Sequence, residues 1–147
     1  KLENIVLTKK GHVKLIDFGF SKKLVKHART YTQCGTKGYA APEIVQDLGH
    51  DISSDIWSFG ILFCHMITGS ADKKDIDVKS ARLIPKEPEA KDLISKCLSK
   101  FPDNRPTVGT IMQHKFFETI DWDEVRELGV SQYFTPDLCG AFDDRYY

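Results

Sequence analysis

Two oxygen-bearing side chains near the start of the chain, Asn4 and Asp17, could together bind a hard cation. Asn4 begins the apolar run NIVL and Asp17 ends the run HVKLID, and the polar stretch TKKG between them predicts a hairpin. A hairpin would bring the amide of Asn4 close to the carboxylate of Asp17, and such oxygens suit Mg²⁺. Lys1, three residues before Asn4, would add a positive charge for a phosphate group. Taken singly, however, these residues are better explained as a surface Asn, a turn Asp and a solvated Lys.

The elements that must position these residues are a small hairpin and several helices, so we expect a mainly α fold. Residues 20–40 are polar and predict a long loop, which in a compact domain is usually functional or disordered. The segment SSDIWSFGILFCHMITG predicts a helix that Ser53 caps and Gly69 ends, with apolar residues on nearly all sides. Further helices are predicted at PEAKDLISKCL, after Thr107, and at DWDEVRELG, where Asp121 caps the start.

The composition narrows the class of protein. The chain has 147 residues, 41% of them apolar, which is enough for one ordinary globular domain. Its 21 basic and 21 acidic side chains give no formal net charge, so neither nucleic acid nor an anionic membrane is indicated as a partner. No apolar run is long enough to span a bilayer. The 4 cysteines are widely spaced and predict reduced thiols in an intracellular, cytoplasmic protein rather than a zinc site or disulfides.

Taken in order, the short motifs of the chain resemble those of eukaryotic protein kinases. KLEN, DFG and APE follow one another at kinase-like spacing, and SSDIWSFGILFCHMITG resembles the central helix of the kinase large lobe. PEAKDLISKCLSKFPDNRPTVGTIMQHKFF resembles the region that ends the kinase core. The segments RTYTQCGTKGYAAPEIV and FFETIDWDEV look like the AGC group, which includes the cyclic-nucleotide-dependent kinases. The resemblance implies the C-terminal lobe of a kinase fold over residues 1–120, without the N-terminal lobe, and an AGC-like tail over residues 121–147.

The resemblance also implies roles for the residues around the hairpin. Asp17 would bind the Mg²⁺ that bridges the ATP phosphates, Asn4 would hold a second Mg²⁺, and Lys1 would neutralise charge on the γ-phosphate. Phe18 would pack beneath the site, and Gly19 would let the backbone turn. ATP and Mg²⁺ are therefore the expected cofactors.

Four further residues match positions of the kinase large lobe. Thr36 would steady the catalytic loop and the acceptor hydroxyl. Asp55 would accept backbone hydrogen bonds from the catalytic loop, although the helix dipole alone also favours an acid in a first helical turn. Glu43 and Arg105 match a structural ion pair, and if that pair is buried, the loss of one partner would cost roughly 3–5 kcal/mol.

Thr32 matches the activation-loop phosphorylation site of the AGC group. Phosphorylation adds nearly two negative charges, which can order a loop against basic side chains. Lys22 matches one such basic partner, and Arg29 lies nearby in the sequence. The resemblance therefore implies an upstream kinase and a regulatory subunit as partners, in addition to a protein substrate. The alternative is an ordinary, unmodified loop threonine.

The chain also departs from the family pattern. The aspartate that accepts the substrate proton would precede Lys1 by two residues, and the small lobe with its glycine-rich loop is missing, so we expect this chain alone to be inactive. Residues 70–84 are shorter and more hydrophilic than the corresponding kinase region. Lys37 and His65 stand where two acids help AGC kinases to select basic substrates, whereas Glu3 preserves a third. Recognition of arginine-rich peptides is therefore expected to be weak.

Two functions remain open at this point. The first is ATP- and Mg²⁺-dependent transfer of the γ-phosphoryl group to serine or threonine of protein substrates, by a full-length kinase of which this chain is a fragment. The intact residues Lys1, Asn4 and Asp17 favour it. The second is a catalytically incomplete kinase-like lobe that binds or regulates a partner protein. The missing half of the site and the altered residues 70–84 favour this alternative.

Overall fold

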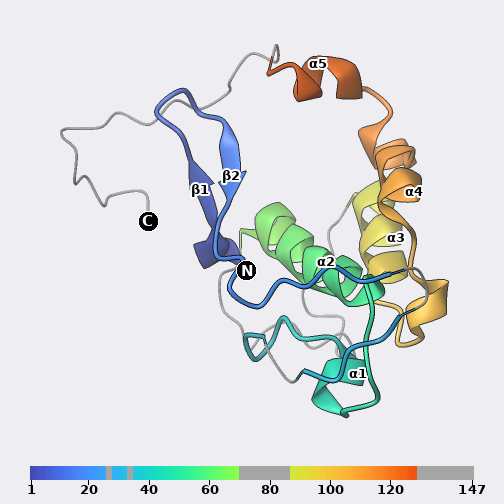
Figure 1. Ribbon diagram of the computed structural model, residues 1–147. Coiled ribbons are helices and arrows are strands. Elements are labelled where there is room, and N and C mark those ends of the chain that lie inside the picture. Colours follow the sequence, from blue (N-terminus) through green and yellow to red (C-terminus); the bar gives the residue numbers. More distant parts are fainter. Residues whose placement is uncertain (26–27, 33–34, 70–86, 129–147) are drawn as a thin grey trace. The chain divides into compact units, whose positions relative to one another are not determined.

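The computed structural model describes residues 1–25, 28–32, 35–69 and 87–128 (Figure 1). The segment 70–84 and most of the expected tail, from residue 129 onward, lie outside the described residues. The chain divides into two compact units, one formed by Lys1–Ser21 with the residues from Ile120 onward, and the other by Lys22–Thr119. Each unit is described by itself.

The first unit contains the predicted hairpin. A single 3₁₀ turn, Leu2–Asn4, leads into strand β1 (Ile5–Leu7), which pairs antiparallel with strand β2 (Val13–Leu15). Ile5 lies opposite Leu15 and Leu7 opposite Val13. The strands are shorter than expected, because Asn4 belongs to the 3₁₀ turn and Asp17 lies two residues beyond β2.

Helix α5 (Trp122–Arg126) also belongs to the first unit. The side chain of Asp121 accepts hydrogen bonds from the backbone N–H groups of Asp123 and Glu124, at 3.0 and 3.1 Å. The predicted cap at Asp121 is therefore confirmed. Such a cap satisfies N–H groups that the first turn of a helix would otherwise leave unpaired.

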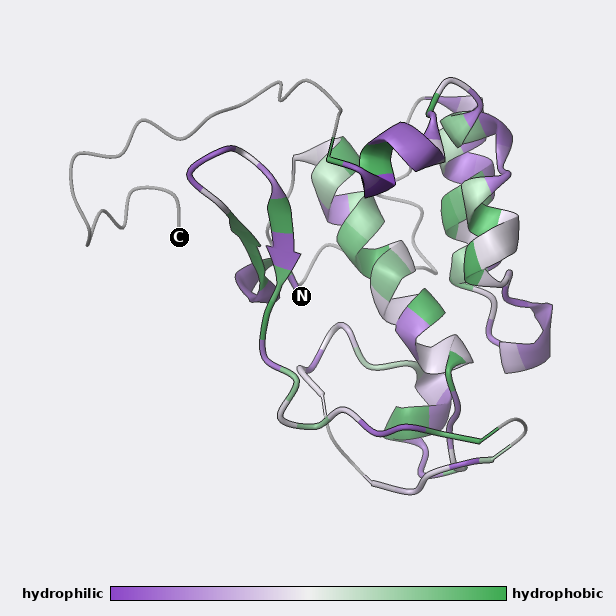
Figure 2. Cartoon of the chain, turned by 45° about the horizontal axis from the view of Figure 1, so that its top comes forward, coloured by the Kyte–Doolittle hydropathy of each residue, from purple (hydrophilic) through white to green (hydrophobic). Residues whose placement is uncertain are grey.

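The second unit is helical and contains the described core. Its helices are α1 (Pro42–Val45), α2 (Ser53–Thr68), α3 (Pro88–Cys97) and α4 (Val108–Met112), with 3₁₀ turns at Pro102–Asn104 and Lys115–Phe117. Helix α2 packs mainly against α3, and apolar residues cover most of the α2 surface (Figure 2). The prediction of a helix buried nearly all round is thus largely confirmed, with Met66, which is 53% exposed, as an exception.

The start of α2 differs from the prediction. Ser53 is the first helical residue and not the cap. Ile52 is the N-cap residue and makes no side-chain capping hydrogen bond, but the side chain of Asp51 just before it accepts the backbone N–H of Ser53 at 2.8 Å, and the Asp51 carbonyl accepts the hydroxyl of Ser54 at 2.8 Å. Burial raises the pKa of Asp51, but hydrogen bonds from Ser53 and the positive charges of Arg29 and Arg105 outweigh it and hold that pKa low. At the other end, Gly69 stops the helix as predicted, with φ of 66°.

Gly60 of α2 lies directly against Cys97, the last residue of α3, and the neighbouring Leu98. A Cβ atom at this position would lie 2.8 Å from Cβ of Cys97 and 2.9 Å from Cδ2 of Leu98. The absence of a side chain at residue 60 is therefore what lets the two helices pack at this distance.

Cys97 and Cys64 are free, buried thiols. Burial raises the pKa of Cys97 to about 11 and also raises the pKa of Cys64.

A buried ion pair joins α1 to the segment that follows α3. Arg105 donates to both carboxylate oxygens of Glu43, at 2.6 and 2.8 Å, and the two residues are 7% and 6% exposed. Arg105 also donates to the carbonyls of Ser53 and Ser99, and its guanidinium lies 5.2 Å from the ring centroid of Trp57. Burial raises the pKa of Glu43, but the Arg105 hydrogen bonds, the residue's own backbone N–H and the Arg105 charge outweigh it, so the pKa lies below the usual value of 4.5.

The close approach at Gly60 predicts that Gly60→Ala destabilises the protein. The new methyl group would overlap Cys97 and Leu98, and such overpacking costs typically about 1–3 kcal/mol of the free energy of unfolding. Urea denaturation measures this loss. Gly109→Ala is the matched control, because Gly109 is also helical and its nearest neighbour to a new Cβ is 3.8 Å away. Equal effects of the two substitutions would contradict the proposed close contact.

The Glu43–Arg105 pair predicts a specific loss of stability in acid. The lowered pKa of Glu43 means that its contribution is complete above 4.5 and is lost as the pH falls through the lower pKa of the folded state. Arg105→Met should cost roughly 3–5 kcal/mol at pH 7, because it leaves a buried carboxylate without its partner. The difference in unfolding free energy between wild type and Arg105→Met should shrink as the pH falls from the raised pKa of the unpartnered Glu43 in the variant to the lowered pKa of Glu43 in the wild type. A difference that stays constant with pH would show that Glu43 is not responsible.

Candidate functional site

The hairpin brings Asn4 and Asp17 to the same end of the first unit. The backbone N–H of Ile16 donates to the carbonyl of Asn4 at 2.9 Å, so Asn4 lies directly opposite the residue that precedes Asp17. The N–H of Asn4 in turn donates to the carbonyl of Lys1 at 3.0 Å, which closes the 3₁₀ turn. These backbone hydrogen bonds place Asn4 and Asp17 at the same end of the hairpin, and Lys1 just before the 3₁₀ turn that leads into it.

The bend after β2 occurs at Asp17 itself. Its φ is 64°, in the left-handed region that Asp tolerates better than most residues, whereas Gly19 has no positive φ. One carboxylate oxygen of Asp17 accepts the N–H of Gly19 at 3.4 Å, and the side chain is exposed. Phe18 is 65% exposed and so is not buried beneath this residue. This geometry leaves the carboxylate of Asp17 accessible to a ligand.

The donor set at this end of the hairpin fits Mg²⁺ only as a partial coordination sphere. Within the described ranges, no three His, Cys, Asp or Glu side chains are grouped closely enough to hold a metal ion. Asn4 and Asp17 would supply two oxygens, and nucleotide phosphates and water would have to supply the others. Mg²⁺ is commonly bound in this way, through one or two carboxylates together with substrate phosphates.

The second unit brings Lys22 and Thr32 together. The ammonium of Lys22 donates to the hydroxyl of Thr32 and, at 3.2 Å, to the hydroxyl of Thr30. Thr30 is also paired with His50 in an isolated antiparallel bridge. Sequence analysis did not identify Thr30, although alternate residues of an extended segment share a face, and the T-x-T spacing indicates that both threonines face the same way.

The turn before α1 contains Thr36, whose carbonyl accepts the backbone N–H groups of Tyr39 and Ala40, at 3.0 and 3.3 Å. Tyr39 is buried, and its carbonyl accepts the hydroxyl of Ser58 at 2.9 Å, which ties this turn to α2. The structure thus gives Thr36 a place in an ordered turn. Its predicted action on the catalytic loop stays a prediction.

The residues expected to select substrate are distributed differently. Glu3 is exposed in the 3₁₀ turn of the first unit. In the second unit Lys37 is exposed, whereas His65 is only 3% exposed, with its ring 5.6 Å from that of Tyr39. His65 therefore belongs to the core and does not present a charge to a peptide. Asp55 is exposed in the first turn of α2.

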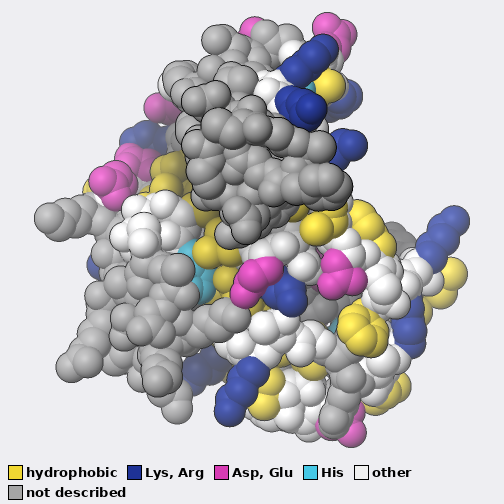
Figure 3. Space-filling view, turned by 90° about the vertical axis from the view of Figure 1, so that its left-hand side faces the viewer, with side chains coloured by type: hydrophobic (Ala, Val, Ile, Leu, Met, Phe, Trp, Pro, Cys, Tyr) yellow, Lys and Arg dark blue, Asp and Glu magenta, His cyan; other side chains and the backbone are white. Residues whose placement is uncertain are grey.

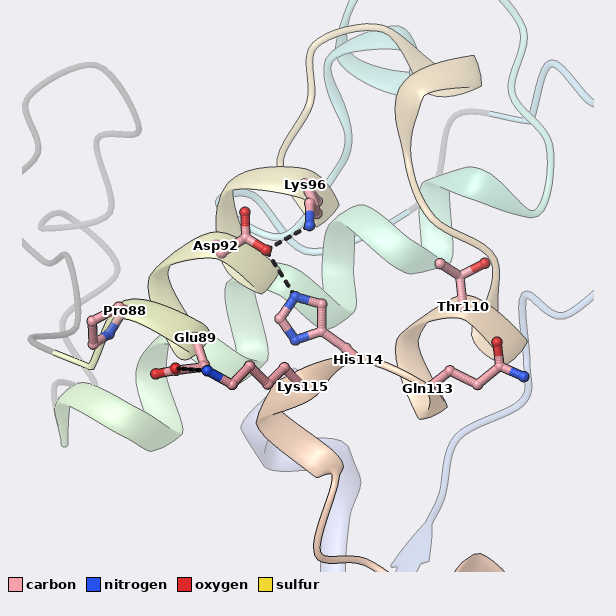
Figure 4. A pocket seen from close by; sticks show the side chains of 8 residues that line it. All are labelled: Pro88, Glu89, Asp92, Lys96, Thr110, Gln113, His114 and Lys115. Atoms are coloured by element: carbon pink, nitrogen blue, oxygen red, sulfur yellow. Dashed lines mark hydrogen bonds and ion pairs between the residues drawn. The ribbon is translucent and has the colours of Figure 1, made fainter.

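A groove of about 540 Å³ lies between α3 and the residues around His114 (Figure 4). His114 accepts the backbone N–H of Phe116 at Nδ1, 3.2 Å, so the ring proton is on Nε2 and is donated to Asp92 at 2.9 Å. Lys96 also contacts Asp92, at 2.5 Å, and Lys115 contacts Glu89 at 3.0 Å. These pairs hold the pKa values of both acids low. The charged groups that line this groove are therefore paired with one another.

On the face of the molecule drawn in Figure 3, acidic and basic side chains are interspersed among the described residues. This agrees with a formal net charge of zero. Among the helices that the structure describes, none combines the length and apolar character that a membrane span requires.

Comparisons with known proteins identify the family. The sequence-family model of the protein kinase domain matches residues 1–117 of this chain. Ribosomal protein S6 kinase alpha-3 of Homo sapiens is 37% identical over 163 aligned residues, and ribosomal protein S6 kinase 2 alpha of Xenopus laevis is 38% identical over 165. Each alignment covers 100% of this chain but only 22% of the relative. The chain therefore belongs to the protein kinase family and, as the sequence resemblance indicates, to its AGC group of serine/threonine kinases.

Proposed function

We propose that this chain is part of an enzyme that transfers the γ-phosphoryl group of ATP to serine or threonine hydroxyls of protein substrates. The observation that carries the proposal is the convergence of Asn4 and Asp17 at one end of the hairpin, with the Asn4 carbonyl fixed by Ile16. Membership of the kinase family supports the same reaction. Because the chain spans about a fifth of the length of its relatives, the activity is proposed for the whole protein.

The residues around the hairpin would act by position and charge. Mg²⁺, when bound, neutralises charge on the phosphates that it bridges. Asp17 would hold one ion through its accessible carboxylate, and Asn4 would hold a second through its amide oxygen. Lys1 would place a positive charge at the γ-phosphate. Gly19 would help to hold the Asp17 carboxylate through its backbone N–H, which donates to one carboxylate oxygen at 3.4 Å.

The second unit would contribute support and substrate contacts. Thr36 would steady the acceptor hydroxyl from its ordered turn, and Asp55 would receive backbone hydrogen bonds of the catalytic loop. Glu3 would provide the remaining acid for a basic substrate, with no help from the buried His65. Weak recognition of arginine-rich peptides is therefore proposed. A regulatory subunit and an intracellular, cytoplasmic location also remain predictions.

Regulation would act through Thr32, as the substrate of an upstream kinase. The contact between Lys22 and the Thr32 hydroxyl supports this role, because the ammonium is already within reach of the position that a phosphate would occupy. A phosphate there would add nearly two negative charges and gain a charge-assisted bond. The loop would then be held more firmly than in the unmodified protein.

Asp17→Asn in the full-length protein tests the proposed reaction. The substitution keeps the size of the side chain and tolerates the positive φ, but it removes the charge that Mg²⁺ requires. We expect Mg²⁺-dependent phosphoryl transfer to fall by roughly 100-fold or more. Asp47→Asn is the control, because Asp47 is also an exposed Asp, with φ of 56°.

Equal activity of Asp17→Asn and wild type would refute the role of Asp17. A full-length wild-type protein that binds a partner protein but transfers no phosphate would instead favour the alternative of a non-catalytic binding module. Mg²⁺-dependent nucleotide binding, measured by calorimetry, separates a loss of binding from a loss of chemistry in the same variants.

Lys22→Met tests the proposed regulation, in a chain that carries phosphothreonine at position 32. A nearby positive charge favours the dianionic phosphate, so Lys22 should depress the second phosphate pKa below its ordinary value of about 6. Titration by ³¹P NMR should show that pKa rising in Lys22→Met. Lys23→Met removes an equally exposed neighbouring charge and should leave it unchanged. A common value for the two variants would exclude Lys22 as the partner of the phosphate.

A further inference from the structure

The segment that carries Thr32 is anchored beside the residues that precede α2. The N–H of Thr30 donates to the carbonyl of His50 at 2.8 Å, and the N–H of His50 donates to the carbonyl of Thr30 at 2.9 Å. Side chains alternate along an extended backbone, so Thr30 and Thr32 face one side and Tyr31 faces the other. The contacts agree with this alternation, because Lys22 reaches both threonine hydroxyls.

Tyr31 lies against Gly49 on the opposite side of this segment. Gly49 is buried and has φ of 74°, and a Cβ atom there would lie 2.7 Å from Cε1 and 2.9 Å from Cζ of Tyr31. The ring therefore occupies the space that any other residue at position 49 would need for its side chain. Because Tyr31 is nevertheless 68% exposed, this contact with Gly49 covers only a minor part of the side chain.

Gly49, on which the Tyr31 ring packs, belongs to the segment that leads directly into α2 of the second unit. Gly49 and His50 precede Asp51, whose side chain accepts the N–H of Ser53, and the carbonyl of Ser53 in the first turn of α2 accepts a hydrogen bond from Arg105. The Tyr31 ring thus packs on a residue that lies shortly before α2. The Thr30–His50 bridge holds the backbone of residues 30–32 in place. The Tyr31–Gly49 contact would keep these residues from turning about the two hydrogen bonds of that bridge.

We propose that Tyr31 and Gly49 are positioning residues for the regulatory site, and that the packing of the Tyr31 ring on Gly49 holds Thr32 within reach of Lys22. The inference rests on the proposed regulation through Thr32. It adds the contact that orients the segment carrying Thr32 towards Lys22. Loss of the contact would let the segment rotate, so that the Thr32 side chain leaves the ammonium. The substitutions that test it lie outside both the Mg²⁺ ligands and the Lys22–Thr32 pair itself.

Hydrogen exchange of the Thr30 and His50 amides tests the anchor in the intact chain. Gly49→Ala should speed exchange at both amides by at least about tenfold, relative to amides in α2, because the new methyl group displaces the ring. Gly69→Ala is the matched control: Gly69 also has a positive φ, 66°, but no atom lies within 4 Å of its Cβ position. If the two variants speed exchange equally, backbone strain explains the effect and the proposal is overturned.

Variants of Tyr31 avoid the backbone strain altogether, because the side chain is largely exposed. Tyr31→Phe retains the ring and should exchange like wild type, whereas Tyr31→Ala should speed exchange at Thr30 and His50. Adding Gly49→Ala to Tyr31→Ala should have only the effect of Gly69→Ala, since the colliding ring is gone. Wild-type exchange rates in Tyr31→Ala would overturn the proposal.

The phosphate titration shows whether the contact positions Thr32. In chains with phosphothreonine at position 32, Tyr31→Ala should move the phosphate pKa to the value of Lys22→Met, and Tyr31→Phe should keep the wild-type value. A wild-type phosphate pKa in Tyr31→Ala would overturn the positioning role. If Lys22→Met itself has no effect, the proposed regulation fails, while the exchange experiment still decides whether Tyr31 and Gly49 anchor the segment.

Discussion

The second unit depends on the buried ion pair between Glu43 and Arg105, which joins α1 to the segment that follows α3. Arg105 uses its planar set of N–H groups to satisfy the carboxylate of Glu43 and the carbonyls of Ser53 and Ser99 at once. Its flat face lies over Trp57. A buried pair of this kind adds little net stability over a well-packed apolar pair, but the loss of one partner is severe. Its contribution is the orientation of α1 relative to α2.

Sequence patterns correctly predicted the helices and caps that depend on residues close together in the sequence. The apolar spacing of α2 and α3, Pro88 at the start of α3, the helix after Thr107 and the cap at Asp121 were all predicted, since each depends on residues a few positions apart. The partners Glu43 and Arg105 are 62 residues apart, and only the family resemblance paired them. The hairpin was predicted from its turn, and the shared end of Asn4 and Asp17 followed from it.

The features that sequence reasoning missed depend on the surrounding fold. The side chain of Asp51, and not that of Ser53, accepts an N–H group at the start of α2, because the chain turns two residues before the helix. The left-handed residue after β2 is Asp17 rather than Gly19, and no local preference would choose an Asp next to an available Gly. Likewise, His65 was identified only as the replacement of a substrate-selecting acid, and its burial beside Tyr39 depends on the neighbouring turn.

The pair of thiols at the contact of α2 and α3 has a use that follows from its burial. A thiolate reacts with alkylating reagents far faster than a thiol, and with a pKa of about 11 Cys97 is almost entirely protonated at neutral pH while the helices remain packed. It becomes reactive when the packing opens and water reaches the sulfur. The alkylation rate of Cys97 therefore reports how often these two helices separate, and measuring it requires no added label.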